Sequence, residues 1–318
     1  MLDIALSLAP IFLLILIGHA MKRGRFVPDT FWAPAEKLTY FVTFPALLVA
    51  NLAGADLAGL AWPAIALSLG GATLGVAGLA LALRRWVGGT AAAFTSAFQG
   101  AIRPNTYIGL AGAAALFGDA GVTLTAVCIA IVVPLVNVLA VACLSVFVPA
   151  HGGASLKATL VGIARNPLIL ACVIGIALNV MGLGLPPVAG PLLKILGAAA
   201  LPVGLLAVGA GLALDALRGA GRPLVTACVL KLGVLPLTAA VILVGLSTAG
   251  MKVNAAAFGI AMLYAALPCS ASSYVLARQM GGDAPLMANI ITLQTLLAAG
   301  TIPVVLMALA LAGLTPLP

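Results

Sequence analysis

Three residues that can do chemistry stand together in an otherwise apolar stretch: Arg103, Pro104 and Asn105, within GAIRPNTYIGLA. A guanidinium stays charged at any working pH, and its forked donors match a carboxylate. Proline removes a backbone donor and clashes with the preceding turn, so a helix is expected to break here. A helix that resumes after a break directs free N–H groups and its positive dipole end into the gap. This cluster therefore favours the binding of a small anion.

A second interruption of the same kind lies at LPCSASSY, where hydroxyl groups follow a proline. A single proline in a membrane helix can be a simple kink, which membranes tolerate. Two prolines that are each followed by polar residues favour unwound backbone that lines a water-filled cavity, because unpaired backbone groups cannot face lipid. We predict two broken helices that cross near the middle of the membrane. The candidate substrate-binding residues at the breaks are Arg103, Pro104, Asn105, Thr106, Tyr107, Pro268, Ser270, Ser272 and Ser273.

Two cations, Arg103 and Lys231, lie deep in apolar segments, whereas every acidic residue falls near a loop or a terminus. A charge at the bilayer centre costs at least a few kcal/mol, so each cation is expected to have a partner. One hypothesis is that the missing counter-ion is the substrate, a small carboxylate at Arg103, with Lys231 as a candidate protonation switch. The alternative is structural, with backbone carbonyls or hydroxyl groups holding either side chain. Two amides, Asn137 and Gln294, either line the same cavity or form hydrogen bonds between helices.

The absence of buried acids in the sequence argues against a sodium/proton exchanger of the usual kind. Sodium could still bind carbonyl and hydroxyl oxygens near the breaks, so the coupling ion, proton or sodium, stays open. No acid pair, histidine cluster or aspartate-rich diphosphate motif lies at membrane depth, so we predict no enzyme. We also predict no cofactor and no metal site.

The composition places these residues in a membrane protein. Of the 318 residues, 64% are hydrophobic and 7% are charged, which leaves too little polar material to cover a soluble surface. The basic residues are scattered, so the net charge of +8 indicates orientation in a bilayer and no nucleic-acid partner. A span needs about 20 apolar residues. Ten runs meet this need, at 2–21, 35–53, 60–83, 92–117, 121–148, 165–183, 189–213, 223–246, 255–277 and 285–312.

The basic residues predict the orientation of these spans. Lys and Arg gather in the connections after the odd-numbered runs, at Lys22, Arg23, Arg25, Lys37, Arg84, Arg85, Lys157, Arg165, Arg218, Arg222 and Arg278. Cytoplasmic loops carry such an excess. We therefore expect a multi-pass membrane protein with both termini outside.

An internal repeat relates the two halves of the chain. Eight residues separate Pro10 from Gly18 and also Pro167 from Gly175. In the second part of each half, Pro104 precedes Asp119 by the same 15 residues by which Pro268 precedes Asp283. Five spans in each half would place the second half upside down relative to the first, as in many secondary transporters. The expected fold class is an all-α membrane protein of two inverted five-helix repeats, with broken, crossing helices four and nine.

The chain resembles bacterial members of the auxin efflux carrier family, which are related to the plant PIN-type carriers. The resemblance is nearly full-length and is strongest at RPNTYIGLAGAAALFGDAG, VPLVNVLAV and ALPCSASSYVLARQMGGDAPLMANIITLQTLL. It implies a homodimer in which a transport domain moves past a scaffold, and a binding region at Asn105 and the neighbours of Pro104 and Pro268. It implies a scaffold from 1–57 and 151–216, and a transport domain from 58–150 and 217–318. Bacterial relatives are described as permeases for malate or malonate, which suits a cationic site. The resemblance to these relatives also implies a location in the bacterial inner membrane.

These observations predict a secondary transporter that moves a small organic anion, a mono- or dicarboxylate, by alternating access of the elevator type. The alternative is a sodium-coupled symporter of the bile-acid type, which shares crossed helices and an inverted repeat. Sodium dependence of uptake would separate the two. A membrane-embedded enzyme fits less well, because no catalytic constellation lies at membrane depth. A channel or a structural protein fits less well, because neither requires a repeated pair of broken helices.

Overall fold

The computed structural model describes residues 2–55, 61–148, 161–162, 164–214 and 221–313. Among these residues the fold is helical and contains no strand, as the sequence predicts. The elements are α1 (Leu2–Arg23), η1 (Asp29–Phe31), α2 (Trp32–Leu38), η2 (Thr39–Thr43), α3 (Phe44–Ala53), α4 (Trp62–Ala82), α5 (Arg84–Val87), α6 (Ala91–Ile102), α7 (Thr106–Phe147), α9 (Pro167–Val180), α10 (Ala189–Ala198), α11 (Ala200–Ala210), α12 (Arg222–Val229), η5 (Leu230–Val234), α13 (Leu235–Thr248), α14 (Ala255–Ala265), α15 (Ser272–Met280) and α16 (Ala284–Leu311).

Six helical segments of the described chain are long and apolar enough to cross a membrane: Ile4–Arg23, Trp62–Ala82, Ala91–Phe147, Ala189–Ala210, Arg222–Thr248 and Ala284–Leu311. The apolar helices Pro167–Val180 and Ala255–Ala265 are shorter. One of the six segments contains more than one predicted run, because α7 continues through a kink at Gly118, where φ is 59°. The count of ten spans stays a prediction.

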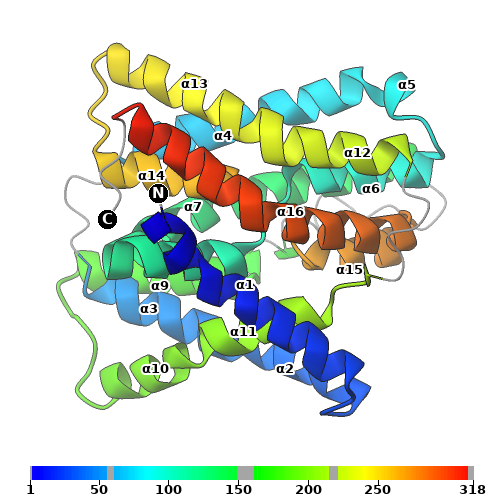
Figure 1. Cartoon of the computed structure of the whole chain (residues 1–318). Coiled ribbons are helices and arrows are strands. Elements are labelled where there is room, and N and C mark those ends of the chain that lie inside the picture. The colour runs from blue at the N-terminus through cyan, green and yellow to red at the C-terminus, as the bar shows by residue number, and fades with distance from the viewer. Residues whose placement is uncertain (1, 56–60, 149–160, 163, 215–220, 314–318) are drawn as a thin grey trace.

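The helices form two groups (Figure 1). Helices α1, α2, α3, α9, α10 and α11 pack together in the lower part of the view, with α1 along α11 and α3 along α9. The upper part holds α4, α6, α12, α13, α14, α15 and α16, and α7 contacts helices of both groups. The start of α1 and the end of α16 lie at one end of the bundle, whereas α5 and the end of α1 lie at the other.

Several expectations fall outside the described residues. The predicted domain boundaries at 57/58, 150/151 and 216/217 lie there, as do Lys157 and Arg218 of the basic connections.

Short polar side chains begin the helices that frame the two interruptions. Thr90 accepts a hydrogen bond from a backbone N–H of α6, Asn254 does the same for α14, and Asp283 does so for α16. Such caps satisfy N–H groups that lack a partner in the first turn. The helix starts are therefore set locally by the sequence.

Candidate functional site

Both predicted interruptions are helix breaks in the structure. Helix α6 ends at Ile102, Arg103 is extended (φ −83°, ψ 122°), and α7 begins at Thr106. Helix α14 ends at Ala265 and α15 begins at Ser272. The two breaks are joined directly, because the Asn105 backbone N–H donates to the Pro268 carbonyl over 2.8 Å.

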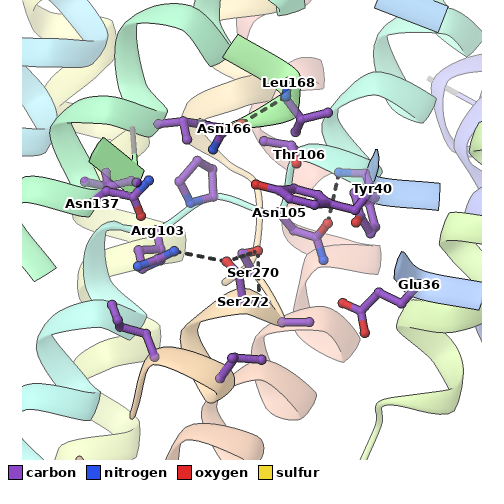
Figure 2. Close-up of a pocket in the computed structure, with 18 of the residues that line it drawn as sticks. Glu36, Tyr40, Arg103, Asn105, Thr106, Asn137, Asn166, Leu168, Ser270 and Ser272 are labelled. Carbon is purple, nitrogen blue, oxygen red and sulfur yellow. Dashed lines mark hydrogen bonds between the residues drawn. The ribbon is translucent and has the colours of Figure 1, made fainter. Parts of the chain in front are cut away.

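Asn105 uses its side chain to start α7. Its Oδ1 accepts hydrogen bonds from the backbone N–H groups of Tyr107 (3.1 Å) and Ile108 (3.3 Å). The expectation that this helix end offers free N–H groups to an anion is therefore wrong for these two groups, because asparagine is among the best N-terminal caps. The positive dipole end of α7 still lies at the break. The Asn105 amide nitrogen is turned away from the cap (Figure 2).

A cavity of about 690 Å³ lies beside the two breaks. This volume is typical of sites for small molecules. Figure 2 shows polar side chains from the first break, the second break and α2 around it. The predicted residues that line it are Arg103, Pro104, Asn105, Thr106, Tyr107, Asn137, Ser270 and Ser272. Much of the remaining lining is apolar, including Val133, Val136, Leu168, Val275 and Leu276.

Arg103 is the buried cation of this cavity. Its side chain is 7% exposed, and its Nη2 donates to the Ser272 hydroxyl over 3.0 Å. Its Nη1 is buried without a hydrogen-bond partner among the described residues. Ser270 and Ser272 share a hydrogen bond of 3.0 Å at the start of α15. The guanidinium therefore lies beside the positive dipole end of α15, and both would favour a bound anion.

Four predicted site residues do not line the cavity: Pro268, Ser273, Lys231 and Gln294. The Pro268 carbonyl accepts the bond from Asn105. Ser273 is fully buried and its hydroxyl contacts the Cys269 thiol. Lys231 reaches the end of α14 from the opposite side of the first break.

Gln294 holds the two breaks together. Its Oε1 accepts from the Cys269 backbone N–H (2.8 Å), and its Nε2 donates to the carbonyls of Gly100 and Ala227 (3.0 Å each). The Gly100 carbonyl needs this donor because the residue four positions later is Pro104, which has no N–H. Of the two roles that the sequence left open for this amide, the structure favours hydrogen bonding between helices.

We expect Gln294→Leu to lower the free energy of unfolding by about 1–3 kcal/mol, because it leaves a buried N–H and a buried carbonyl without partners. Gln99 offers a matched control: it is also 0% exposed, but neither of its amide atoms has a partner among the described residues. Gln99→Leu should leave stability unchanged or raise it. Thermal unfolding in detergent measures both variants. An equal loss in the two would contradict the bridging role.

Sequence reasoning missed several polar cavity residues, among them Glu36, Tyr40 and Asn166. Glu36 was placed near a loop, yet its carboxylate lies across the cavity from Arg103 (Figure 2). Asn166 accepts hydrogen bonds from the N–H groups of Leu168 and Ile169 and begins α9. Its signal was present as Asn-Pro, an N-terminal cap followed by proline in the first turn. No comparable signal marks Tyr40, which lies in η2, since only the tertiary structure brings it to the cavity.

In this bundle of apolar helices, two helices are interrupted beside a cavity that polar side chains line in part. This is the architecture of a membrane transporter, since unwound backbone at membrane depth must be buried in protein or line such a cavity. The sequence profile of the family described as "Membrane transport protein" matches residues 3–306. The chain therefore belongs to this family, the auxin efflux carrier family, which confirms the resemblance found in the sequence. A search of curated proteins finds no match.

Proposed function

We propose that this protein is a secondary transporter that carries a small organic anion, a mono- or dicarboxylate, across the bacterial inner membrane by alternating access. The observation that carries the proposal is Arg103, a buried cation that lines a cavity of about 690 Å³ and whose Nη1 has no partner among the described residues. An unpaired guanidinium in a membrane protein is costly, so a bound carboxylate would stabilise it. The hydroxyls of Ser270 and Ser272 and the amide of Asn105 add donors for the same group.

Close packing supports an inverted repeat with helices that cross at the breaks. A methyl group on Gly18 of α1 would overlap the backbone of Leu206 in α11, and one on Gly175 of α9 would meet the backbone of Val49 in α3. The same 31 residues separate Gly18 from Val49 and Gly175 from Leu206. Exchanging the two halves of the chain therefore turns the contact of Gly18 with Leu206 into the contact of Gly175 with Val49, as a two-fold repeat requires.

The caps of the broken helices follow the same relation. Thr90 caps α6 and lies 14 residues before Pro104, and Asn254 caps α14 and lies 14 residues before Pro268. The two broken helices thus start at equivalent positions in the two halves and stop within one residue of equivalent positions. The hydrogen bond from Asn105 to Pro268 joins the breaks where crossing helices would meet.

The grouping of the helices supports an elevator. The lower group in Figure 1, α1–α3 with α9–α11, corresponds to the proposed scaffold, and the upper group to the proposed transport domain. Arg103, Asn105 and Ser272 belong to the transport domain, whereas Glu36 and Tyr40 belong to the scaffold. In this proposal the substrate moves with the residues of the transport domain and loses its contacts with those of the scaffold. The scaffolds of two subunits form a homodimer.

The cavity is open toward the cytoplasm in our proposal. Its lining includes Lys37, Gly162 and Met280, which lie beside connections after odd-numbered runs. These connections carry the basic residues, and basic loops stay in the cytoplasm. On the other side of the first break, the Tyr107 ring stacks on Phe44 of α3, with centroids 4.5 Å apart and planes at 12°. The stacked rings would separate the cavity from the outside in this inward-facing state.

Counterflow in liposomes tests the function. Vesicles loaded with unlabelled malate, malonate, lactate or an aromatic acetate are diluted into the labelled compound, with protein-free vesicles as the control. We expect a transient, saturable accumulation of label for at least one carboxylate, because exchange through a single alternating site couples the two fluxes. Equilibration without accumulation would indicate a channel. No acceleration for any carboxylate would contradict the proposal.

A further inference from the structure

Lys231 is a buried cation that the cavity does not use. It lies in η5, between α12 and α13, and its side chain is 1% exposed. Its Nζ donates to the Ala265 carbonyl over 3.5 Å, and Ala265 is the last residue of α14. A void of about 10 Å³, bordered by Lys231, Tyr264 and Pro104, adjoins this contact. The Lys231 side chain therefore lies at the end of one broken helix and borders the same void as Pro104, the residue that breaks the other.

The position matters because of what a broken helix leaves at its end. The residues after α14 satisfy only part of its end: the Ala266 and Leu267 N–H groups donate to the carbonyls of Met262 and Tyr264. The Ala265 carbonyl lies beyond these bonds, and the helix dipole places partial negative charge there. At membrane depth such an end needs a cation. In transporters with broken helices, half-helix ends and unwound carbonyls coordinate the coupling sodium or proton.

The first break has a cation at the corresponding place. Helix α6 ends at Ile102, and the next residue is Arg103. A basic residue thus follows the end of α6 in the chain, although its guanidinium donates to Ser272 at the start of α15, whereas η5 supplies the cation at the end of α14. The positive ends, at the starts of α7 and α15, remain for an anion.

We propose that the Lys231 ammonium is a tethered cation that takes the place of a coupling sodium ion at the carbonyl end of α14. Lys231 is then a positioning residue: it holds the second break in shape, and carboxylate transport needs no sodium. The statement that transport needs no sodium rests on the proposed function, whereas the electrostatic role of Lys231 at the end of α14 does not. Sodium coupling of the bile-acid symporter type is the outcome that this inference excludes.

Thermal unfolding of the purified protein tests the electrostatic role without any substrate. Wild type should unfold at the same temperature in sodium chloride and in choline chloride, because its cation site is occupied by a side chain. Lys231→Ala should unfold at least about 5 °C lower in choline and recover part of this loss with sodium or n-propylammonium, which replaces the removed atoms. The matched control is Lys252→Ala, which removes an exposed lysine just before α14. It should behave as wild type.

Two outcomes of this experiment would overturn the proposal. One is saturable stabilisation of the wild type by sodium, which would place a sodium site in the intact protein. The other is a Lys231→Ala protein that responds to neither cation, which would mean that no cation is needed at α14. If Lys231→Ala does not fold, the wild-type comparison decides alone.

Transport then separates this inference from the proposed function. Carboxylate counterflow by the wild type should be the same in sodium and in choline, within about twofold. Stimulation of about tenfold or more by sodium would overturn the role of Lys231 and leave the carrier function intact. A complete absence of carboxylate counterflow in either salt would overturn the proposed function, and the unfolding data would still decide on Lys231.

Discussion

Arg103→Gln is expected to weaken carboxylate binding by about 10–150-fold, which corresponds to about 1.5–3 kcal/mol for hydrogen bonds to a charged group. The variant loses the donor Nη1, which is buried and has no partner in the described part of the chain, and the charge that faces the cavity. Glutamine keeps a polar side chain that can still approach Ser272, so the break should persist. Thermal shift with the carboxylates that show counterflow measures the affinity, and counterflow at saturating substrate measures the residual rate.

Two control variants distinguish the effect of the charge from the effects of side-chain geometry and of nonspecific destabilisation. Arg103→Lys keeps the charge but loses the planar fork, so its affinity should fall between those of wild type and Arg103→Gln. Arg278→Gln removes an exposed arginine from α15, near Ser272 in sequence, and should leave affinity unchanged. Wild-type affinity in Arg103→Gln would refute the anion site. It would show that Arg103 is held by the protein alone.

Gly209→Ala is expected to disrupt the packing of α1 on α11 and to lower the free energy of unfolding by about 3 kcal/mol or more. A methyl group at Gly209 would overlap the Ile15 carbonyl oxygen and lie 2.7 Å from its carbonyl carbon. Both atoms belong to the backbone of α1, so no side-chain rotation can relieve the clash. Close backbone approach at small residues is a main source of helix association in membranes, since lipid is as apolar as the side chains. Unfolding in detergent and the yield of folded protein measure the effect.

Gly245→Ala is the matched control. Gly245 lies in α13, and a methyl group there would meet nothing within 4 Å. Because alanine is the better helix former, this variant should gain up to about 1 kcal/mol. If Gly209→Ala were as stable as Gly245→Ala, the contact between α1 and α11 would not determine the stability of the lower group.

The sequence was sufficient for features that depend on neighbours in the chain. The composition required a membrane protein, and Pro104 and Pro268 predicted both helix breaks, because proline acts on its own turn. The family was also evident from contiguous motifs. The caps at Thr90, Asn105 and Asn254 follow from the same local rule, since an N-terminal cap binds the N–H groups two or three residues ahead.

Contacts between side chains of different helices could not be predicted from the sequence. Gln294 and Lys231 looked like further site residues because an isolated polar residue in an apolar run carries no direction. Packing turned Gln294 toward the carbonyl that Pro104 deprives of a donor, and Lys231 toward the end of α14. For Glu36 the error was the reverse. Its position near a loop in the sequence did not suggest a site residue, yet α2 places it at the cavity.

The chain alone was enough to establish where helices break, which segments are apolar and which residues carry charge, since these depend on composition and on contacts within one turn. Which of those charges face a cavity, and which neutralise a helix end, depends on the three-dimensional packing of helices that lie far apart in sequence. Arg103 and Lys231 look alike in the sequence, as single cations in apolar surroundings. They differ because the fold gives Lys231 a backbone carbonyl, whereas Arg103 lines the cavity and one of its donors is buried without a partner among the described residues.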